Sequence, residues 1–182
     1  MAQVKVLSRT TTDFERRLYE INQLALSVFE PERALHKTPT NSRQLQIDDW
    51  KQRLQQTDAC IFYVTDEIQQ PTAFFFTHPR STTKDADARD SYQEHSYHIY
   101  LAAVQPGQRG KGLFKLLIEA TKQKATECGY LSMTVATIPA RFPRMYGLLS
   151  RPSSGWKPIE EKIVEMPGGS SERKVVMQIV LD

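Results

Sequence analysis

The residues best suited to do chemistry gather in a glycine-rich turn, V-Q-P-G-Q-R-G-K-G-L-F-K-L-L, at residues 104–117. The aromatic and apolar run at 96–104 is typical of a strand, and helix-forming residues occupy 113–128. Glycines let a backbone approach a ligand closely, and the free N–H groups of a first helical turn attract anions. A phosphate or pyrophosphate site is therefore predicted at Arg109, Gly110, Lys111 and Gly112. The alternative is a tight strand-to-helix turn without a ligand.

The turn differs from a P-loop and from G-x-G-x-x-G, because Lys115 stands where the last glycine of the second pattern would be. It resembles motif A of the GNAT superfamily of acyl-coenzyme A-dependent N-acyltransferases. In that motif Arg or Gln is followed after two residues by Gly, and after one more by Gly or Ala; Arg109, Gly112 and Phe114 hold these positions. The resemblance implies that acyl-CoA is the co-substrate and that its pyrophosphate contacts Arg109, Gly110, Lys111, Gly112, Leu113 and Phe114.

Length and composition are those of one soluble domain spanning residues 1–182. The chain has 182 residues, of which 40% are hydrophobic and 25% charged, and this is ordinary for a globular protein. It has no long apolar run and does not begin like a signal peptide, so we expect a cytoplasmic protein without a membrane span.

Charge and cysteine content argue against other classes of protein. A net charge of +3 without a basic cluster does not favour nucleic acid as a partner. The two cysteines, Cys60 and Cys128, lack the neighbouring Cys and His residues of a zinc site or a disulfide framework. We expect both to be packing residues and expect no metal site.

The order of elements follows from hydrophobic periodicity and turn residues. Helices are predicted at 13–29, 44–56, 113–128 and 138–149, and strands at 3–7, 60–64, 72–77, 96–104, 130–137, 156–165 and 173–181. Residues 30–43 are expected to form a loop because they hold Pro31 and Pro39, and residues 79–94 to form a polar excursion. In the second helix, Leu45 and Leu54 are the clearest inward-facing residues.

This order resembles the GNAT order over almost the whole chain. The resemblance implies an α+β (mixed α/β) three-layer fold, with a mostly antiparallel sheet of about seven strands flanked by about four helices. It also implies a V-shaped splay between the fourth and fifth strands, where pantetheine bonds the exposed strand edge. By position, Ala102 would present its N–H to the acyl carbonyl, and Val104 would bond the pantetheine arm. The alternative for Ala102 is simple close packing.

A candidate general acid follows from motif B of the same family, which reads like N-x-x-A-x-x-L-Y. The segment here is P-A-R-F-P-R-M-Y, so Tyr146 stands at the tyrosine position, while Pro139 replaces Asn and Phe142 replaces Ala. A phenol with a pKa of ~10 can donate a proton to a thiolate whose conjugate acid has a pKa of ~8.5. The alternative role for Tyr146 is to line the core.

A candidate general base stands on the predicted central strand. Many family members carry Glu six residues before the position of Val104, and this chain carries His98 there. A histidine with a reference pKa of ~6.5 is mostly neutral at cellular pH and can accept a proton directly or through water. One alternative is that the nearby Glu94 is the base. The other is that His98 has only a structural role.

The resemblance implies transfer of an acetyl or short acyl group from acyl-CoA to a primary amine, by direct attack in a ternary complex. The alternative is a module of the same fold that binds acyl-CoA without catalysis. The compact chain favours a small-molecule amine over a protein acceptor, and Arg141 and Arg144 are candidates to attract a carboxylate or the 3′-phosphate of the cofactor. We expect a monomer or homodimer.

Overall fold

The computed structural model describes residues 2–35, 45–80, 96–166 and 169–181. These residues form seven strands in one sheet, in the order β1-β2-β3-β4-β5-β7-β6. The strands are β1 (Val4–Leu7), β2 (Cys60–Thr65), β3 (Pro71–Pro79), β4 (Ser96–Val104), β5 (Ser132–Thr137), β6 (Lys157–Glu165) and β7 (Ser171–Val180). Among the described pairs, β4 and β5 are parallel and the others antiparallel. The predicted mixed, mostly antiparallel sheet is confirmed.

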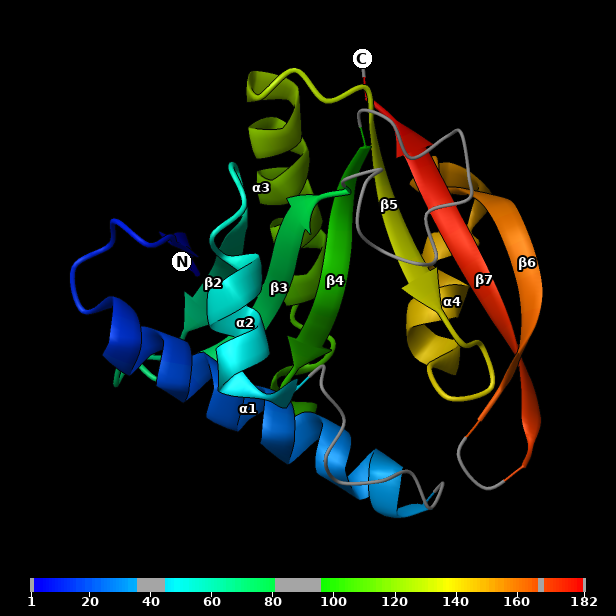
Figure 1. The fold of residues 1–182 in the computed structure, drawn as a ribbon, viewed down its shortest axis with the longest axis horizontal. Coiled ribbons are helices and arrows are strands. Elements are labelled where there is room, and N and C mark those ends of the chain that lie inside the picture. Colours follow the sequence, from blue (N-terminus) through cyan, green and yellow to red (C-terminus); the bar gives the residue numbers. More distant parts are fainter. Residues whose placement is uncertain (1, 36–44, 81–95, 167–168, 182) are drawn as a thin grey trace.

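Helices cover both faces of the sheet and make three layers (Figure 1). Helices α1 (Phe14–Leu35) and α2 (Ile47–Arg53) pack on one face, where the core includes Trp50 and Phe76. Helices α3 (Leu113–Glu127) and α4 (Pro143–Leu149) lie on the other face, over a core that includes Phe75. The alternation of side chains along β3 explains this division, because successive residues of a strand point to opposite faces.

The fourth and fifth strands separate before they end. The β4–β5 ladder runs from Ser96 opposite Ser132 to Ile99 opposite Val135, whereas β4 remains paired with β3 as far as Val104. Figure 1 shows the two ribbons diverging below this short ladder. The predicted splay is therefore present, and it leaves the last residues of β4 without a partner strand on the β5 side among the described residues.

The first helix is longer than predicted. Its expected end was residue 29, with a loop from residue 30, but α1 continues to Leu35 and includes Pro31. Proline has a φ angle that suits a helix, and its missing N–H removes one hydrogen bond within the helix, which a helix of 22 residues tolerates. The extension carries α1 across the foot of the strands toward α4 (Figure 1). The rest of the expected loop, residues 36–44, lies outside the described residues.

Other boundaries differ by a few residues. Helix α2 is shorter than the predicted 44–56, although Leu45 and Leu54 are buried as expected. The predicted helix at 138–149 begins at Pro143, because the segment before it is a turn. Most of the predicted polar excursion at 79–94 lies outside the described residues. Cys60 is buried and Cys128 half-buried, and both are free thiols.

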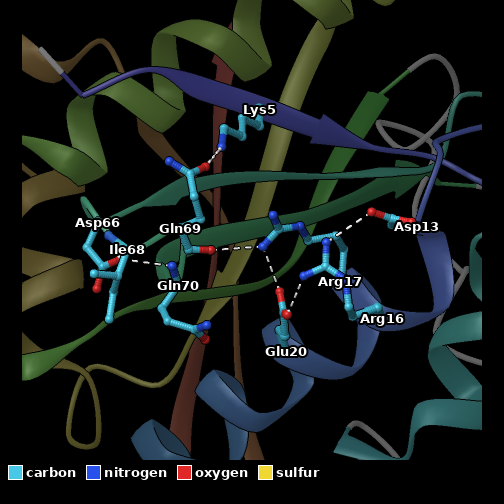
Figure 2. A network of polar contacts seen from close by, with 9 residues as sticks. All are labelled: Lys5, Asp13, Arg16, Arg17, Glu20, Asp66, Ile68, Gln69 and Gln70. Carbon is cyan, nitrogen blue, oxygen red and sulfur yellow. Dashed lines mark hydrogen bonds and ion pairs between the residues drawn. The ribbon is translucent and has the colours of Figure 1, made fainter.

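The turn between β2 and β3 is held against α1 by a polar network (Figure 2). Nη1 of Arg17 donates to the backbone oxygen of Gln69 at 2.8 Å and to a carboxylate oxygen of Glu20 at 2.7 Å. Lys5 on β1 also donates to the side chain of Gln69. Within the turn, the Asp66 carboxylate accepts hydrogen bonds from two backbone N–H groups. The network fixes the start of β3, the strand against which the end of β4 is aligned.

Candidate active site

The strand-to-helix turn has the backbone that its glycines predict. A short 3₁₀ turn, Pro106–Gln108, follows β4, and then Gly110 and Gly112 take φ angles of 82° and 76°. These left-handed conformations are unfavourable for residues with a side chain. A Cβ atom added at either glycine would meet no atom within 4 Å. The glycines are therefore required by backbone conformation, and the space beside them is open to a ligand.

Helix α3 begins immediately at this open space. Gly112 is its N-cap and makes no side-chain capping bond, so the first-turn N–H groups lack the usual internal acceptor. The exposed cations Arg109 and Lys111 flank the turn; Nε of Arg109 donates to the Val104 oxygen at 3.3 Å, and Nζ of Lys111 donates to Gln108 at 2.7 Å. Uncapped N–H groups, the helix dipole and two cations together favour an anion.

Leu113 and Phe114 hold the start of α3 against the sheet. Leu113 is buried, and the ring of Phe114 packs edge-on against Phe75 of β3, with ring centroids 5.0 Å apart. The large residue at the last motif A position therefore contributes to packing under the helix. A ligand at this turn would meet the backbone of these two residues rather than their side chains.

The free edge of β4 presents backbone groups toward the splay. The N–H of Gln105 donates to the Thr72 oxygen at 2.8 Å, so Gln105 faces β3. Backbone groups alternate in direction along an antiparallel strand, and therefore Ala102 and Val104 direct their N–H and C=O groups away from β3. The Arg109 bond to the Val104 oxygen agrees with this direction. Both residues are half-buried, and their backbone groups point to the side where β5 has separated from β4.

Tyr146 lies on α4, one helical turn after Phe142, whose oxygen accepts the Tyr146 N–H at 3.0 Å. Its ring packs partly against the α3-side core. On its exposed side, Arg173 of β7 approaches: Nη2 lies 3.5 Å from the hydroxyl oxygen, and the guanidinium carbon lies 5.8 Å from the ring centroid. Arg173 is itself bound by both carboxylate oxygens of Glu161 on β6. Sequence reasoning missed Arg173, because nothing in the sequence links it to α4.

His98 lies in the last part of the β4–β5 ladder, opposite Thr134, whose hydroxyl is 2.9 Å from Nδ1. The residue is 8% exposed, and its ring is 5.7 Å from that of His78. Burial lowers the pKa of His98 well below its usual value, and the positive charge of Arg80 acts in the same direction. His98 is therefore neutral at physiological pH. The alternative base, Glu94, lies outside the described residues.

A further cluster of polar side chains includes Tyr100. This residue is unpaired in the β3–β4 ladder, because the register shifts between Phe76 and Thr77. The Tyr100 hydroxyl donates to the Asp49 carboxylate at 3.3 Å, and the guanidinium of Arg53 lies 4.0 Å from its ring centroid. Arg53 and Asp49 form an ion pair at 2.9 Å. Burial raises the pKa of Tyr100 to about 12, although nearby Arg53 opposes this shift. The group ties α2 to β4 on the face opposite α3.

Arg141 has a different role from the one expected. Its guanidinium binds both carboxylate oxygens of Glu172 on β7, at 2.6 and 3.1 Å, and the two side chains are only 9% and 15% exposed. This pair fixes the turn before α4 to the last hairpin. Arg141 is therefore engaged within the protein, whereas Arg144 is exposed on α4.

Solved structures with the same arrangement were found, although no protein-family model and no curated protein sequence matches the chain. A phosphinothricin acetyltransferase of the GNAT superfamily from Sinorhizobium meliloti, in complex with acetyl-CoA, has a TM-score of 0.69 and 14% identity, covering 99% of this chain and 88% of that one. The chain has the GNAT fold. yncA of Salmonella typhimurium, with acetyl-CoA as its cofactor, has a TM-score of 0.70 and 16% identity, covering 100% and 95%.

A third structure with the GNAT fold is the ribosomal-protein-S18-alanine N-acetyltransferase of Escherichia coli. Its TM-score is 0.64 and its identity 15%, covering 100% of this chain and 95% of that one. Among the described residues there is no group of three or more His, Cys, Asp or Glu that could hold a metal ion. No described helix is long and apolar enough to cross a membrane.

Proposed function

We propose that this protein is an acyl-CoA-dependent N-acyltransferase that transfers an acetyl or short acyl group to a primary amine of a small molecule. The observation that carries the proposal is the joining of two backbone features by one turn: the free edge of β4 at Ala102 and Val104, and the uncapped start of α3 at Gly112. The first suits the amide groups of a pantetheine arm, and the second suits its pyrophosphate.

In the proposed reaction the backbone of this chain binds and orients the thioester. The Ala102 N–H donates to the acyl oxygen, where negative charge develops as the amine attacks. The Val104 backbone bonds the pantetheine arm, while Arg109, Gly110, Lys111, Gly112, Leu113 and Phe114 surround the pyrophosphate. These contacts hold the acyl carbon in place for direct attack by the amine within a ternary complex.

Two side chains move the protons. Neutral His98 takes a proton from the acceptor's ammonium group, directly or through water, so that the free amine can attack, and Tyr146 gives its hydroxyl proton to the departing thiolate. Arg173, beside the Tyr146 hydroxyl, then stabilises the negative charge left on the phenol oxygen. Protein geometry supports both roles, since His98 lies one residue before the end of the β4–β5 ladder and Tyr146 lies on the helix that follows β5.

The proposal is tested by incubating the purified protein with acetyl-CoA and a panel of amines while release of the free thiol is followed. Amine-dependent thiol release, with a product heavier than the amine by one acetyl group, is the expected result. Stabilisation by acetyl-CoA without turnover of any amine would favour the non-catalytic binding module instead.

A further inference from the structure

A row of polar side chains crosses the middle of the sheet. His78 lies opposite His98 in the β3–β4 ladder, and His98 lies opposite Thr134 in the β4–β5 ladder, so the three side chains share one face. The His78 ring is 5.7 Å from that of His98 and 5.6 Å from that of Tyr100, which packs against the α1-side core. None of the three is more than 8% exposed. His98 is therefore enclosed between a neighbour on β3 and a neighbour on β5.

The two ring nitrogens of His98 have different surroundings. Nδ1 lies 2.9 Å from the Thr134 hydroxyl, and no other hydrogen bond to this ring is found among the described residues. Nε2 is not one of the enclosed side-chain atoms that lack a hydrogen-bond partner in that part of the chain. Nε2 thus keeps contact with solvent, whereas Nδ1 is occupied by Thr134. Only Nε2 is placed to meet an amine or a water molecule.

The bond between Nδ1 and the Thr134 hydroxyl can run in either direction, with opposite consequences for Nε2. A neutral imidazole carries one hydrogen, and its other nitrogen has the lone pair. If the hydroxyl donates to Nδ1, the hydrogen of His98 is on Nε2, which then cannot take a proton. If Nδ1–H donates to the hydroxyl oxygen, Nε2 holds the lone pair.

We propose that Thr134 is a positioning residue for His98: its hydroxyl oxygen accepts the hydrogen bond from Nδ1–H, which leaves the lone pair on Nε2 as the proton acceptor. This inference rests on the proposed function, in which His98 is the general base. Thr134 suits the role because it is 0% exposed and its β-branched side chain has a stiff χ1 angle, so the hydroxyl is held in place. The bond fixes both the orientation and the tautomer of the ring.

The first test observes the tautomer directly, by ¹⁵N NMR of protein labelled at its four histidines, with the His98 signals assigned by their absence from His98→Gln. At neutral pH the wild type and Thr134→Ser should show a protonated Nδ1 and an unprotonated Nε2. Thr134→Val has nearly the same shape but no hydroxyl, and it should lose this preference. An unprotonated Nδ1 in the wild type would overturn the proposal. The wild-type signals decide this point even if Thr134→Val does not fold.

The second test measures kcat/KM with acetyl-CoA and an amine that serves as acceptor. Thr134→Val should lower kcat/KM by about 10-fold or more, because a histidine in the wrong tautomer is a poor base, and Thr134→Ser should restore most of the loss. In the His98→Gln background, Thr134→Val should have no further effect, since Thr134 acts through His98. Thr121→Val is the matched control: Thr121 is also 0% exposed, but its hydroxyl donates to the Leu117 oxygen within α3, at 2.8 Å.

The outcomes separate this inference from the proposed function. An equal loss from Thr134→Val with and without His98, or a loss that Thr134→Ser does not restore, would overturn the positioning role while leaving the acyltransferase function standing. Absence of turnover with every amine would overturn the proposed function, and the NMR signals would still decide the direction of the hydrogen bond.

Discussion

Arg173 of β7 lies against Tyr146 of α4, with one guanidinium nitrogen 3.5 Å from the phenol oxygen and the guanidinium carbon 5.8 Å from the ring centroid. The contact places a cation beside the group that would lose a proton to the departing thiolate. Because Glu161 binds the same guanidinium through both oxygens, the cation is held at this position. The last hairpin thus orients the candidate acid as well as completing the sheet.

Replacing Tyr146 with Phe should lower turnover by roughly 10²- to 10⁴-fold, because the ring is kept and the acidic hydroxyl is lost. Affinity for acetyl-CoA should change little, since the hydroxyl acts in the reaction and not in binding. Steady-state kinetics and cofactor titration measure the two quantities. Tyr19→Phe, at an exposed position of α1, is the control and should have no effect. Full activity in Tyr146→Phe would assign the ring to the wall of the site.

If His98 is the general base, the rate should depend on pH, and the change in rate should occur at a lower pH than for an ordinary histidine. Its lowered pKa means that the rising limb of kcat/KM lies well below pH 6.5, and that His98 is already deprotonated at neutral pH. His98→Gln should remove this limb and lower the rate on the plateau. A limb that survives the substitution would assign proton removal to another group, such as Glu94.

The same burial makes His98 affect folding. The unfolded chain binds a proton near pH ~6.5, whereas the folded chain resists it. The contribution to stability is therefore complete above that pH and is lost as pH falls below it. Melting temperatures measured from pH 7 to pH 5 should fall less steeply for His98→Gln than for the wild type. Parallel slopes would contradict the assigned environment of His98.

The Arg141–Glu172 pair should contribute strongly to stability. Arg141→Met leaves a largely buried carboxylate without its bidentate partner, which costs about 3 kcal/mol or more in the free energy of unfolding. Denaturant unfolding measures this loss. Arg144→Met provides a control on the exposed surface of α4, where a change below about 0.5 kcal/mol is expected. Equal effects of the two substitutions would contradict a structural role for the pair.

The sequence predicted the features that depend on local pattern. The strands, the glycine turn and α3 follow from alternation, backbone requirements and helical periodicity, and the structure has all of them. The predicted end of α1 was wrong, because proline usually ends a helix but α1 continues through Pro31. The shift in register that sets Tyr100 apart has no local signal, since it depends on how two strands pair.

Contacts between segments far apart in the chain could not be predicted from the sequence. Thr134 beside His98, Arg173 beside Tyr146, and the ring pair of Phe29 and Phe142 each join elements that meet only after the sheet has formed. For the Phe29–Phe142 contact, the sequence offered one indication, which is that Phe142 replaces the Ala of motif B. Phe29 could not be inferred as the partner of Phe142, because a loop was predicted from residue 30, where α1 in fact continues toward α4.

The most direct test of the account compares Gly112→Leu with Gly129→Leu. Both glycines are left-handed, with φ of 76° and 78°, lie at opposite ends of α3, and have open space where a Cβ would be placed, so each substitution should cost roughly 1–2 kcal/mol in backbone strain. At 100 times its Kd, acetyl-CoA should stabilise the wild type by about 2.7 kcal/mol. We predict that the resulting rise in melting temperature persists in Gly129→Leu and disappears in folded Gly112→Leu; an undiminished rise in Gly112→Leu would contradict pyrophosphate binding at this turn.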